Sequence, residues 1–340
     1  MDILLLLVGL GLILGGANFL TDGSAAVAQR FRVPEFIIGL TIVAVGTSMP
    51  ELVVSVLSAA AGNSDVAIGN VVGSNIFNVF VILGICALIR PLVLTKENIR
   101  RDIPFGMAAS LVLLAVTSDR LVCAGATDRI GRPDGIVMLA LYIGLMWYMI
   151  RTTKRQRGMP GAAGGTIIPA SEAGAIVKNG VKQAEGTKKP MALWLAGVMI
   201  AGGLAGLIFG GEMFLKSATA IARTLGISES VIALTLVAGG TSLPELASSV
   251  VSVVKGRPDI ALGNVVGSNI ANILLILGLC STVVPLTPGG IDAVTLGAVV
   301  LSSLLLFAAA FTFRRRALDR WEGVLFLAIY SAYLWWLLAK

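Results

Sequence analysis

The heptapeptide GTSMPEL at residues 46–52 recurs as GTSLPEL at residues 240–246, and GNVVGSNIFN at residues 69–78 recurs as GNVVGSNIAN at residues 263–272. One offset of 194 residues relates both pairs, and the 49-residue stretch that contains them matches its copy at 29 positions without a gap. Agreement of this kind along a continuous stretch indicates an internal duplication. The chain is therefore expected to consist of two structurally equivalent halves.

Composition narrows the class of protein in which this duplication occurs. Of the 340 residues, 56% are hydrophobic and only 13% are charged, and the mean hydropathy is +0.91. Soluble domains carry about 25% charged residues, so a soluble enzyme is excluded. The chain has no histidine, which excludes imidazole proton shuttles and histidine metal sites. The three cysteines stand apart in apolar surroundings and are expected to be packing residues.

Apolar stretches of about 20 residues, the length that spans roughly 30 Å of hydrocarbon, recur along the whole chain. The first is expected to be a retained transmembrane helix and not a secretory signal, because Asp2 stands where a signal would carry basic residues. The predicted spans are residues 3–29, 34–60, 65–89, 102–118, 134–151, 191–222, 228–254, 259–281, 290–313 and 322–339.

Lysine and arginine fall unevenly between the predicted loops. If the N-terminus lies outside, 20 of the 26 basic residues lie on the cytoplasmic side, as basic residues of short loops usually do. The net charge of +7 is then a topology signal, so no nucleic-acid partner is inferred. The basic run that begins at Arg151 is interpreted as the flank of a span. The chain is therefore predicted to be an integral protein of a prokaryotic plasma membrane, with the lipid bilayer as its partner.

Five predicted spans separate each residue from its counterpart. Because five is odd, the two copies must enter the membrane in opposite directions. The sequence therefore predicts an all-α membrane protein with ten transmembrane helices in a 5+5 inverted-topology repeat. Residues 1–152 form the first repeat, residues 153–190 a cytoplasmic linker and residues 191–340 the second repeat.

Glu51 and Glu245 lie deep inside apolar spans that contain no basic residue in their interiors. An ionised side chain at such a depth costs at least about 2.5 kcal/mol, so it is usually functional. Pro50 and Pro244 lack an N–H, so backbone carbonyls just before them lose regular helical partners. Two carboxylates brought together by the repeat would form an anionic pocket for a cation or for a pair of protons. The alternative is a protonated, hydrogen-bonded pair without a ligand.

Other oxygen-bearing residues recur at helical spacing around each glutamate. They are Thr47, Ser48, Asn70, Ser74 and Asn78 in the first copy and Thr241, Ser242, Asn264, Ser268 and Asn272 in the second. Hard oxygen ligands in forgiving geometry favour calcium, with sodium as an alternative. No cofactor is expected.

Two glycine pairs and the tryptophans are interpreted as structural. Gly69 with Gly73, and Gly263 with Gly267, have the GxxxG spacing that allows close helix packing. The tryptophans stand near predicted span ends and are expected to be interfacial anchors.

The paired GTSMPEL/GTSLPEL and GNVVGSNI segments resemble those of the calcium/cation antiporter superfamily, most closely the compact prokaryotic sodium/calcium exchangers. The two motif blocks cover about 100 residues, and the ten-span plan with its central linker extends the resemblance over the chain. The resemblance implies a secondary active transporter and not an enzyme, which exchanges calcium for sodium by alternating access of one central site. Helices 1 and 6 would slide across a core formed by the other eight, without an obligate protein partner.

The resemblance also implies a set of ligands. The calcium ligands would be the carboxylates of Glu51 and Glu245 and the backbone carbonyls of Thr47 and Thr241. The flanking sodium sites would draw on Ala44, Ser48 and Ser74 from one repeat, on Ala238, Ser242 and Ser268 from the other, and on Asn78. Asn272 departs from the pattern, because exchangers of this family often have aspartate there. This departure leaves the coupling ion open.

The function predicted from the sequence is therefore sodium/calcium antiport at a central two-glutamate site. Proton/calcium exchange is the first alternative, because two protons could neutralise the glutamates as well as sodium could. A gated cation channel with the same carboxylates is the alternative from a different class, and the inverted repeat argues against it.

Overall fold

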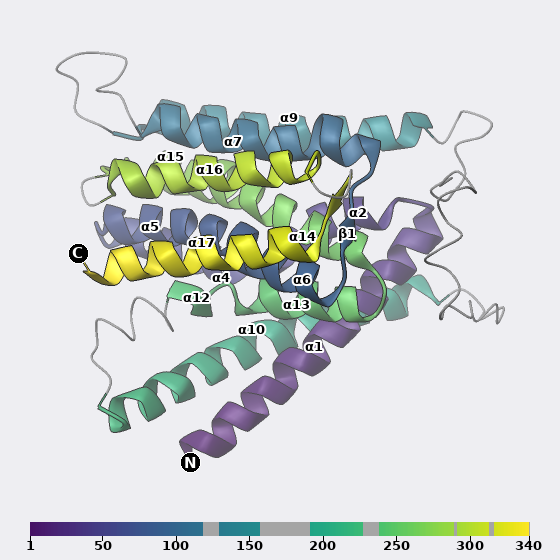
Figure 1. The fold of residues 1–340 in the computed structure, drawn as a ribbon, viewed down its shortest axis with the longest axis horizontal. Helices are drawn as coiled ribbons and strands as arrows, with labels where there is room; N and C mark the ends of the chain where they lie inside the picture. The colour runs from purple at the N-terminus through teal and green to yellow at the C-terminus, as the bar shows by residue number, and fades with distance from the viewer. Residues whose placement is uncertain (118–128, 157–190, 227–237, 289–290, 313–315, 340) are drawn as a thin grey trace.

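The computed structural model is helical almost throughout (Figure 1) and describes residues 1–117, 129–156, 191–226, 238–288, 291–312 and 316–339. The first half consists of α1 (Asp2–Phe31), α2 (Glu35–Ile38), η1 (Gly39–Val43), α3 (Ala44–Thr47), α4 (Met49–Ala60), α5 (Ser64–Phe77), η2 (Asn78–Leu83), α6 (Gly84–Ile89), η3 (Asn98–Asp102), α7 (Ile103–Val116) and α9 (Arg132–Gln156). The elements named η are π-helical turns, which are wider than α-helical turns.

The second half repeats this order among the described residues. It consists of α10 (Leu193–Thr224), α12 (Ala238–Gly240), α13 (Leu243–Val254), α14 (Pro258–Ile270), η6 (Ala271–Leu277), α15 (Gly278–Val283), α16 (Ala293–Ala309) and α17 (Arg320–Ala339). Two short strands, β1 (Leu92–Val93) and β2 (Ala317–Leu318), pair antiparallel and join the connections that follow α6 and α16.

Helical structure occupies each of the ten predicted ranges where the structure describes them. Among the described residues, six helices are both long enough and apolar enough to cross a bilayer, and a seventh span results if the bent pair Glu35–Thr47 and Met49–Ala60 counts as one. The prediction of an all-helical chain with apolar spans is therefore confirmed, with six or seven spans supported by length and composition.

Three sequence features lie wholly or largely outside the described residues. They are Cys123, most of the predicted linker 153–190 and residues 228–237 of the seventh predicted span. Cys86 and Cys280 are buried and unpaired, in agreement with a packing role.

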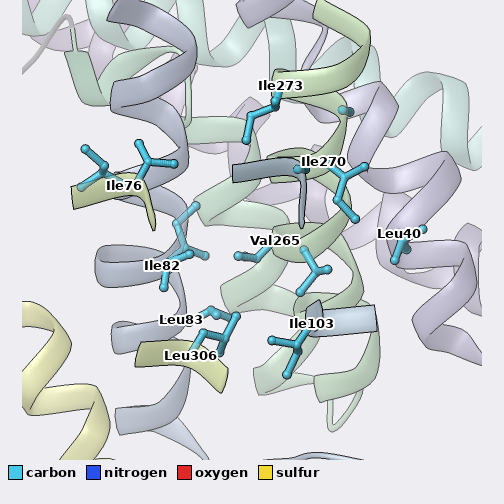
Figure 2. Close-up of a cluster of buried hydrophobic side chains, with 14 of the residues drawn as sticks. Leu40, Ile76, Ile82, Leu83, Ile103, Val265, Ile270, Ile273 and Leu306 are labelled. Atoms are coloured by element: carbon cyan, nitrogen blue, oxygen red, sulfur yellow. The ribbon is translucent and has the colours of Figure 1, made fainter. Parts of the chain in front are cut away.

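The centre of the protein is formed by the third predicted span of each half. The most apolar window of Pro258–Val283 is 94% buried inside the protein and that of Ser64–Ile89 is 72% buried, against 17% for Arg320–Ala339. Apolar side chains from these central helices and from α7 and α16 meet in one cluster (Figure 2). Side chains on the peripheral helices are left to face lipid, while the two GNVVGSNI copies lie in the interior.

Helices α1 and α10 run side by side at an oblique angle to the remaining helices (Figure 1). Glycines let their backbones touch: a Cβ at Gly16 would lie 2.7 Å from the carbonyl oxygen of Gly203, and one at Gly9 would lie 2.9 Å from that of Gly210. Under the 194-residue offset, Gly9 corresponds to Gly203 and Gly16 to Gly210. The crossed contacts are those expected of two halves related by a two-fold axis.

Both predicted helix interruptions are present. A single residue separates the end of α3 from the start of α4. The helical segments Glu35–Thr47 and Met49–Ala60 are bent by 45° at this break. Pro50 lies in the first turn of α4, where a missing N–H is tolerated, but its ring prevents the preceding helix from continuing. Pro244 occupies the same place at the start of α13. The chain is thus broken at GTSMP and GTSLP, and each glutamate begins a new helix.

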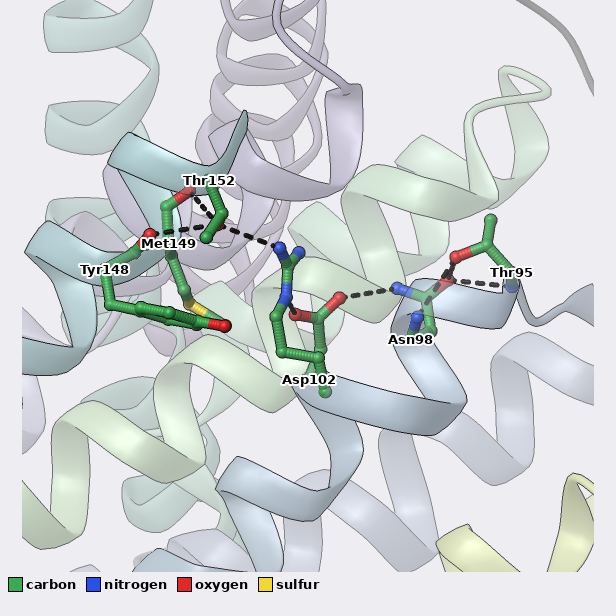
Figure 3. Close-up of polar contacts among 7 residues, drawn as sticks. Thr95, Asn98, Asp102, Tyr148, Met149 and Thr152 are labelled. Atoms are coloured by element: carbon green, nitrogen blue, oxygen red, sulfur yellow. Dashed lines mark hydrogen bonds and ion pairs between the residues drawn. The ribbon is translucent and has the colours of Figure 1, made fainter. Parts of the chain in front are cut away.

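A buried polar network joins the start of α7 to the end of α9 (Figure 3). Asp102 is 1% exposed, and its carboxylate lies 2.6 Å from Arg101 Nε and accepts a hydrogen bond from Asn98 Nδ2 at 3.2 Å. Arg101 also donates to Thr152 Oγ1 at 3.1 Å. Because the carboxylate is paired and hydrogen-bonded, the network stabilises the packing of two helices at the edge of the first half.

Candidate functional site

Glu51 and Glu245 lie in the first turns of α4 and α13, and both side chains are fully buried. The partial positive charge at a helix N-terminus stabilises a carboxylate by about 0.3–1 kcal/mol, which offsets only part of the cost of burying it. Further compensation must come from neighbouring groups or from a bound cation.

Serines connect each glutamate to the other half of the chain. The Ser48 hydroxyl donates to Glu245 Oε1 at 2.9 Å, and the Ser242 hydroxyl donates to Glu51 Oε1 at 3.0 Å. Each motif therefore supplies one carboxylate and one hydroxyl, and the hydroxyl of one motif holds the carboxylate of the other. The structure brings the predicted pair of glutamates into one buried site.

Neither glutamate has a basic partner in the part of the chain that the structure describes. The ion pairs there lie elsewhere, as in Arg257 with Glu35 and Lys216 with Glu212. A buried carboxylate without a fixed cation is costly unless it is protonated or binds a mobile cation. The central site is therefore an anionic pocket when both groups are ionised.

Asn70 and Asn264 connect the central helices to the two motifs. Asn264 Oδ1 accepts a hydrogen bond from Thr47 Oγ1 at 3.2 Å, and Asn70 Oδ1 accepts one from Thr241 Oγ1 at 3.4 Å. Their amide nitrogens donate to the backbone carbonyls of Glu245 and Glu51 at 3.4 and 3.3 Å. These contacts use the hydrogen of each threonine hydroxyl and fix the side chains of Thr47 and Thr241 against the central helices.

Ser74 and Ser268 occupy equivalent places but differ in their contacts. Ser268 Oγ lies 3.0 Å from Ser48 Oγ and donates to the backbone carbonyl of Ala44 at 3.4 Å, whereas Ser74 Oγ is buried without a hydrogen-bond partner. Ser268 and the carbonyl of Ala44 thus lie together beside Ser48. The side chain of Ala238 lies outside the described residues.

Asn78 and Asn272 lie at the first turns of the π-helical elements η2 and η6, and both are fully buried. Asn78 Nδ2 donates to Asn269 Oδ1 at 3.0 Å, and Asn272 Nδ2 donates to Asn75 Oδ1 at 3.3 Å. The amide oxygens of Asn78 and Asn272 have no partner.

Oxygen atoms without partners are the common feature of the site. Buried polar atoms are hydrogen-bonded in the great majority of cases, so each exception needs a cause. Among the described residues at this site, the exceptions are the oxygens Glu51 Oε2, Glu245 Oε2, Ser74 Oγ, Asn78 Oδ1 and Asn272 Oδ1, together with the amide nitrogen Nδ2 of Asn75. The donor set is carboxylate, hydroxyl and amide oxygen from both halves, which is the chemistry of a hard cation. No group of three or more acidic, cysteine or histidine side chains exists among the described residues, so any ion here would rely on neutral oxygens beside the two carboxylates.

The sequence reasoning missed Asn75 and Asn269. They fall outside the four-residue spacing by which Ser74 and Asn78 and their copies were selected, although each lies only three residues before Asn78 or Asn272. Their identity in both copies of the repeat was the available signal.

The glycine pairs of the two copies have different surroundings among the described residues. A Cβ at Gly263 would overlap the carbonyl oxygen of Phe36, and one at Gly267 would overlap that of Leu40, so α14 touches the backbone of α2 and η1. Gly69 and Gly73 meet no described atom within 4 Å. Residues 227–237, which correspond to the segment containing α2 and η1, lie outside the described part of the chain. The packing role is thus observed for the second pair.

Comparison with known proteins follows the same division of the chain. The model of the sodium/calcium exchanger protein family matches residues 1–151 and 195–339. The inner membrane protein YrbG of Escherichia coli K12 is 33% identical over 340 residues, which covers 98% of this chain and 96% of that protein. The sodium/calcium exchanger MaX1 of Methanosarcina acetivorans is 30% identical over 349 residues, covering 98% and 97%. A solved structure of the sodium-calcium exchanger NCX_Mj has a TM-score of 0.77 and 30% identity, covering 98% of this chain and 97% of that one.

The match to exchangers over both halves of the chain, together with the oxygen-lined anionic centre, defines the class of the protein as a membrane transporter. The chain belongs to the sodium/calcium exchanger protein family, within the calcium/cation antiporter superfamily. The family predicted from the repeated motifs is confirmed.

Proposed function

We propose that this chain exchanges Ca²⁺ for Na⁺ across the membrane by alternating access at the site between its two motifs. The observation that carries the proposal is a set of five buried oxygens from both halves that have no partner among the described residues, around two glutamates that have no basic neighbour there. A cation would satisfy these oxygens and neutralise the carboxylates at once. The relatives named as sodium/calcium exchangers support the choice of ions.

Charge balance supports exchange between these two ions. A pocket with a formal charge of −2 is neutralised by one calcium ion or by two sodium ions, so occupancy by one excludes the other. In the proposal, Ca²⁺ binds the carboxylates of Glu51 and Glu245 and the carbonyls of Thr47 and Thr241. The Na⁺ sites draw on Ala44, Ser48, Ser74, Asn78, Ala238, Ser242 and Ser268, and Asn272 is a further candidate oxygen ligand of the pocket.

The proposed arrangement in the membrane has ten spans in a 5+5 inverted repeat. The repeats are residues 1–152 and 191–340, joined by a cytoplasmic linker at residues 153–190. Crossed contacts between α1 and α10 and between the two motifs support the pseudo-two-fold relation. The distribution of basic residues places the N-terminus outside, and the name of the Escherichia coli relative supports a plasma-membrane location.

Alternating access requires a seal that can form on either side of the site. Helix α1 packs against α13, where Thr21 Oγ1 lies 3.0 Å from Ser252 Oγ and Lys255 Nζ lies 2.8 Å from Asp22. Under the 194-residue offset, Asp22 and Lys255 correspond to Lys216 and Ala61, which cannot form an ion pair. We infer that the polar seal belongs to the cytoplasmic side alone, with α1 and α10 as the moving pair.

The function is tested by calcium uptake into proteoliposomes that contain the purified chain. An outward sodium gradient is expected to drive uptake, and equal potassium or proton gradients are expected to leave it near the background. Uptake driven by the proton gradient alone would identify a proton/calcium exchanger. Calcium entry that needs no counter-ion would identify a channel. Either result would overturn sodium/calcium exchange.

Ser242→Ala is expected to lower the apparent calcium affinity by about tenfold. The hydroxyl donates to Glu51, and a hydrogen bond to a charged group contributes about 1.5–3 kcal/mol, while each factor of ten in affinity corresponds to about 1.4 kcal/mol. The measurement is the calcium concentration that gives half-maximal uptake in proteoliposomes.

Ser302→Ala is the matched control. Ser302 is fully buried in α16, and its hydroxyl donates to the carbonyl of Val299 in its own helix. This variant is expected to retain the calcium affinity of the unmodified protein. Equal affinities in Ser242→Ala and Ser302→Ala would contradict the role of the crossed serine.

A further inference from the structure

Two crossed amide pairs lie between the central helices. Asn78 of the first half donates to Asn269 of the second, and Asn272 of the second half donates to Asn75 of the first. All four side chains are buried, with Asn269 the most exposed at 7%. Under the repeat, Asn78 corresponds to Asn272 and Asn75 corresponds to Asn269. The two hydrogen bonds are therefore equivalent.

The orientation of a primary amide matters beside a cation. One end of the group carries an oxygen that accepts, and the other carries an NH₂ group that only donates. The two ends have nearly the same shape, so packing alone does not choose between them. A cation is attracted by the oxygen and repelled by the NH₂ group, so a hydrogen bond that holds the NH₂ end determines whether the pocket can use the side chain.

We propose that Asn269 is a positioning residue that fixes the amide of Asn78 with its oxygen toward the cation site. Asn269 Oδ1 accepts the NH₂ group of Asn78, and this leaves Asn78 Oδ1 buried and without a partner. The inference rests on the proposed function, in which Asn78 supplies an oxygen to a Na⁺ site.

Asn269 is itself held in one orientation. Its Nδ2 donates to the backbone carbonyl of Asn75 at 3.3 Å, and a backbone carbonyl can only accept. The Oδ1 of Asn269 must therefore point the other way, toward Asn78. The backbone carbonyl of Asn75 thus fixes the amide of Asn269, and Asn269 fixes the amide of Asn78. In this orientation Asn78 Oδ1 is the atom left for the cation site.

Asn75 occupies the equivalent place for Asn272 but is held less firmly. Its Oδ1 accepts from Asn272 at 3.3 Å, while its own Nδ2 is buried without a partner. Replacing Asn269 is therefore expected to disturb the amide that it orients more than replacing Asn75 would, so the test uses Asn269.

The test compares Asn269→Leu, Asn78→Ala and the double variant in proteoliposomes, with the KM for sodium and the KM for calcium measured separately. Loss of a residue that orients a metal ligand typically lowers affinity by 10–100-fold, so each single variant is expected to raise the sodium KM by about tenfold. The calcium KM is expected to change by less than about twofold. Because both changes remove the same oxygen, the double variant is expected to match Asn78→Ala, whereas independent effects would multiply.

Two further variants separate positioning from packing. Asn269→Gln keeps both the accepting oxygen and the donating NH₂ group of the amide, and it is expected to give a sodium KM closer to that of the unmodified protein than Asn269→Leu does. Ser303→Ala removes a buried contact between helices, the 2.8 Å bond to Ser110, without touching the amide pairs, and it is expected to leave both KM values unchanged. If Asn269→Leu does not yield folded protein, Asn269→Ser replaces it in the same comparison.

The inference is overturned if the sodium and calcium KM values rise together, if the effects of Asn269→Leu and Asn78→Ala multiply, or if the sodium KM of Asn269→Gln is no lower than that of Asn269→Leu. Failure of the proposed function is distinguishable, because it would appear in the unmodified protein as calcium uptake that does not depend on sodium. In that case the inference falls with it.

Discussion

Glu51→Gln and Glu245→Gln are each expected to lower sodium-driven calcium uptake by at least about 100-fold. Glutamine keeps the size of the side chain and an oxygen that can accept from the crossed serine, so the fold of the site is retained. The pocket charge falls from −2 to −1, and bound calcium would then leave an uncompensated charge in a dry interior. Removing one partner of a buried ion pair costs about 3–5 kcal/mol, and 1.4 kcal/mol corresponds to tenfold.

Glu212→Gln provides the matched control for this pair of variants. Glu212 lies on α10, its side chain is 58% exposed, and it pairs with Lys216 at 2.6 Å. Exposed ion pairs contribute about 0–1 kcal/mol, so uptake by this variant is expected to stay within about twofold of the unmodified protein. Size-exclusion profiles of all three variants test that folded protein reaches the liposomes. Near-normal uptake by either central variant would refute the site assignment.

Gly263→Leu is expected to destabilise the protein by about 3 kcal/mol or more and to abolish the recovery of folded chain. The first added carbon would overlap the carbonyl oxygen of Phe36 and lie 2.9 Å from the backbone nitrogen of Leu40. Backbone atoms cannot move aside as a flexible side chain can, so α14 would have to separate from α2 and η1. The measurement is the thermal unfolding midpoint of detergent-purified protein, together with its yield after size exclusion.

Gly297→Leu makes the same substitution on α16, at an exposed position where no described atom lies within 4 Å of the added carbon. Its unfolding midpoint is expected to match that of the unmodified protein. A midpoint for Gly263→Leu equal to that of Gly297→Leu would contradict the close packing of the central helices.

The sequence predicted the parts of the site that depend on the repeat. A single offset related Glu51 to Glu245, and a two-fold relation makes each motif face the other, as the crossed serine contacts show. Proline positions predicted the helix breaks, because the loss of an N–H has the same local consequence in any context. The ligand roles of these residues and the number of spans stay predictions.

Contacts that depend on the width of a helical turn could not be predicted. Asn78 is the first residue of η2, and Asn272 lies within η6. Each bonds to an asparagine of the other copy, Asn269 or Asn75, which lies three residues before the counterpart position. The four-residue spacing used to select the polar stripe leaves these partners out, and a period of 3.6 residues per turn does not locate the wider turns beside them. Packing between the two halves determines where the wider turns form, and a single sequence does not contain that information.

Equilibrium binding of ⁴⁵Ca²⁺ to the purified chain tests the central claim most directly, since it needs neither a gradient nor a movement of helices. The account predicts one calcium ion bound per chain, displaced by sodium and absent in Glu51→Gln and in Glu245→Gln. Calcium binding that persists when both glutamates are replaced together would contradict it.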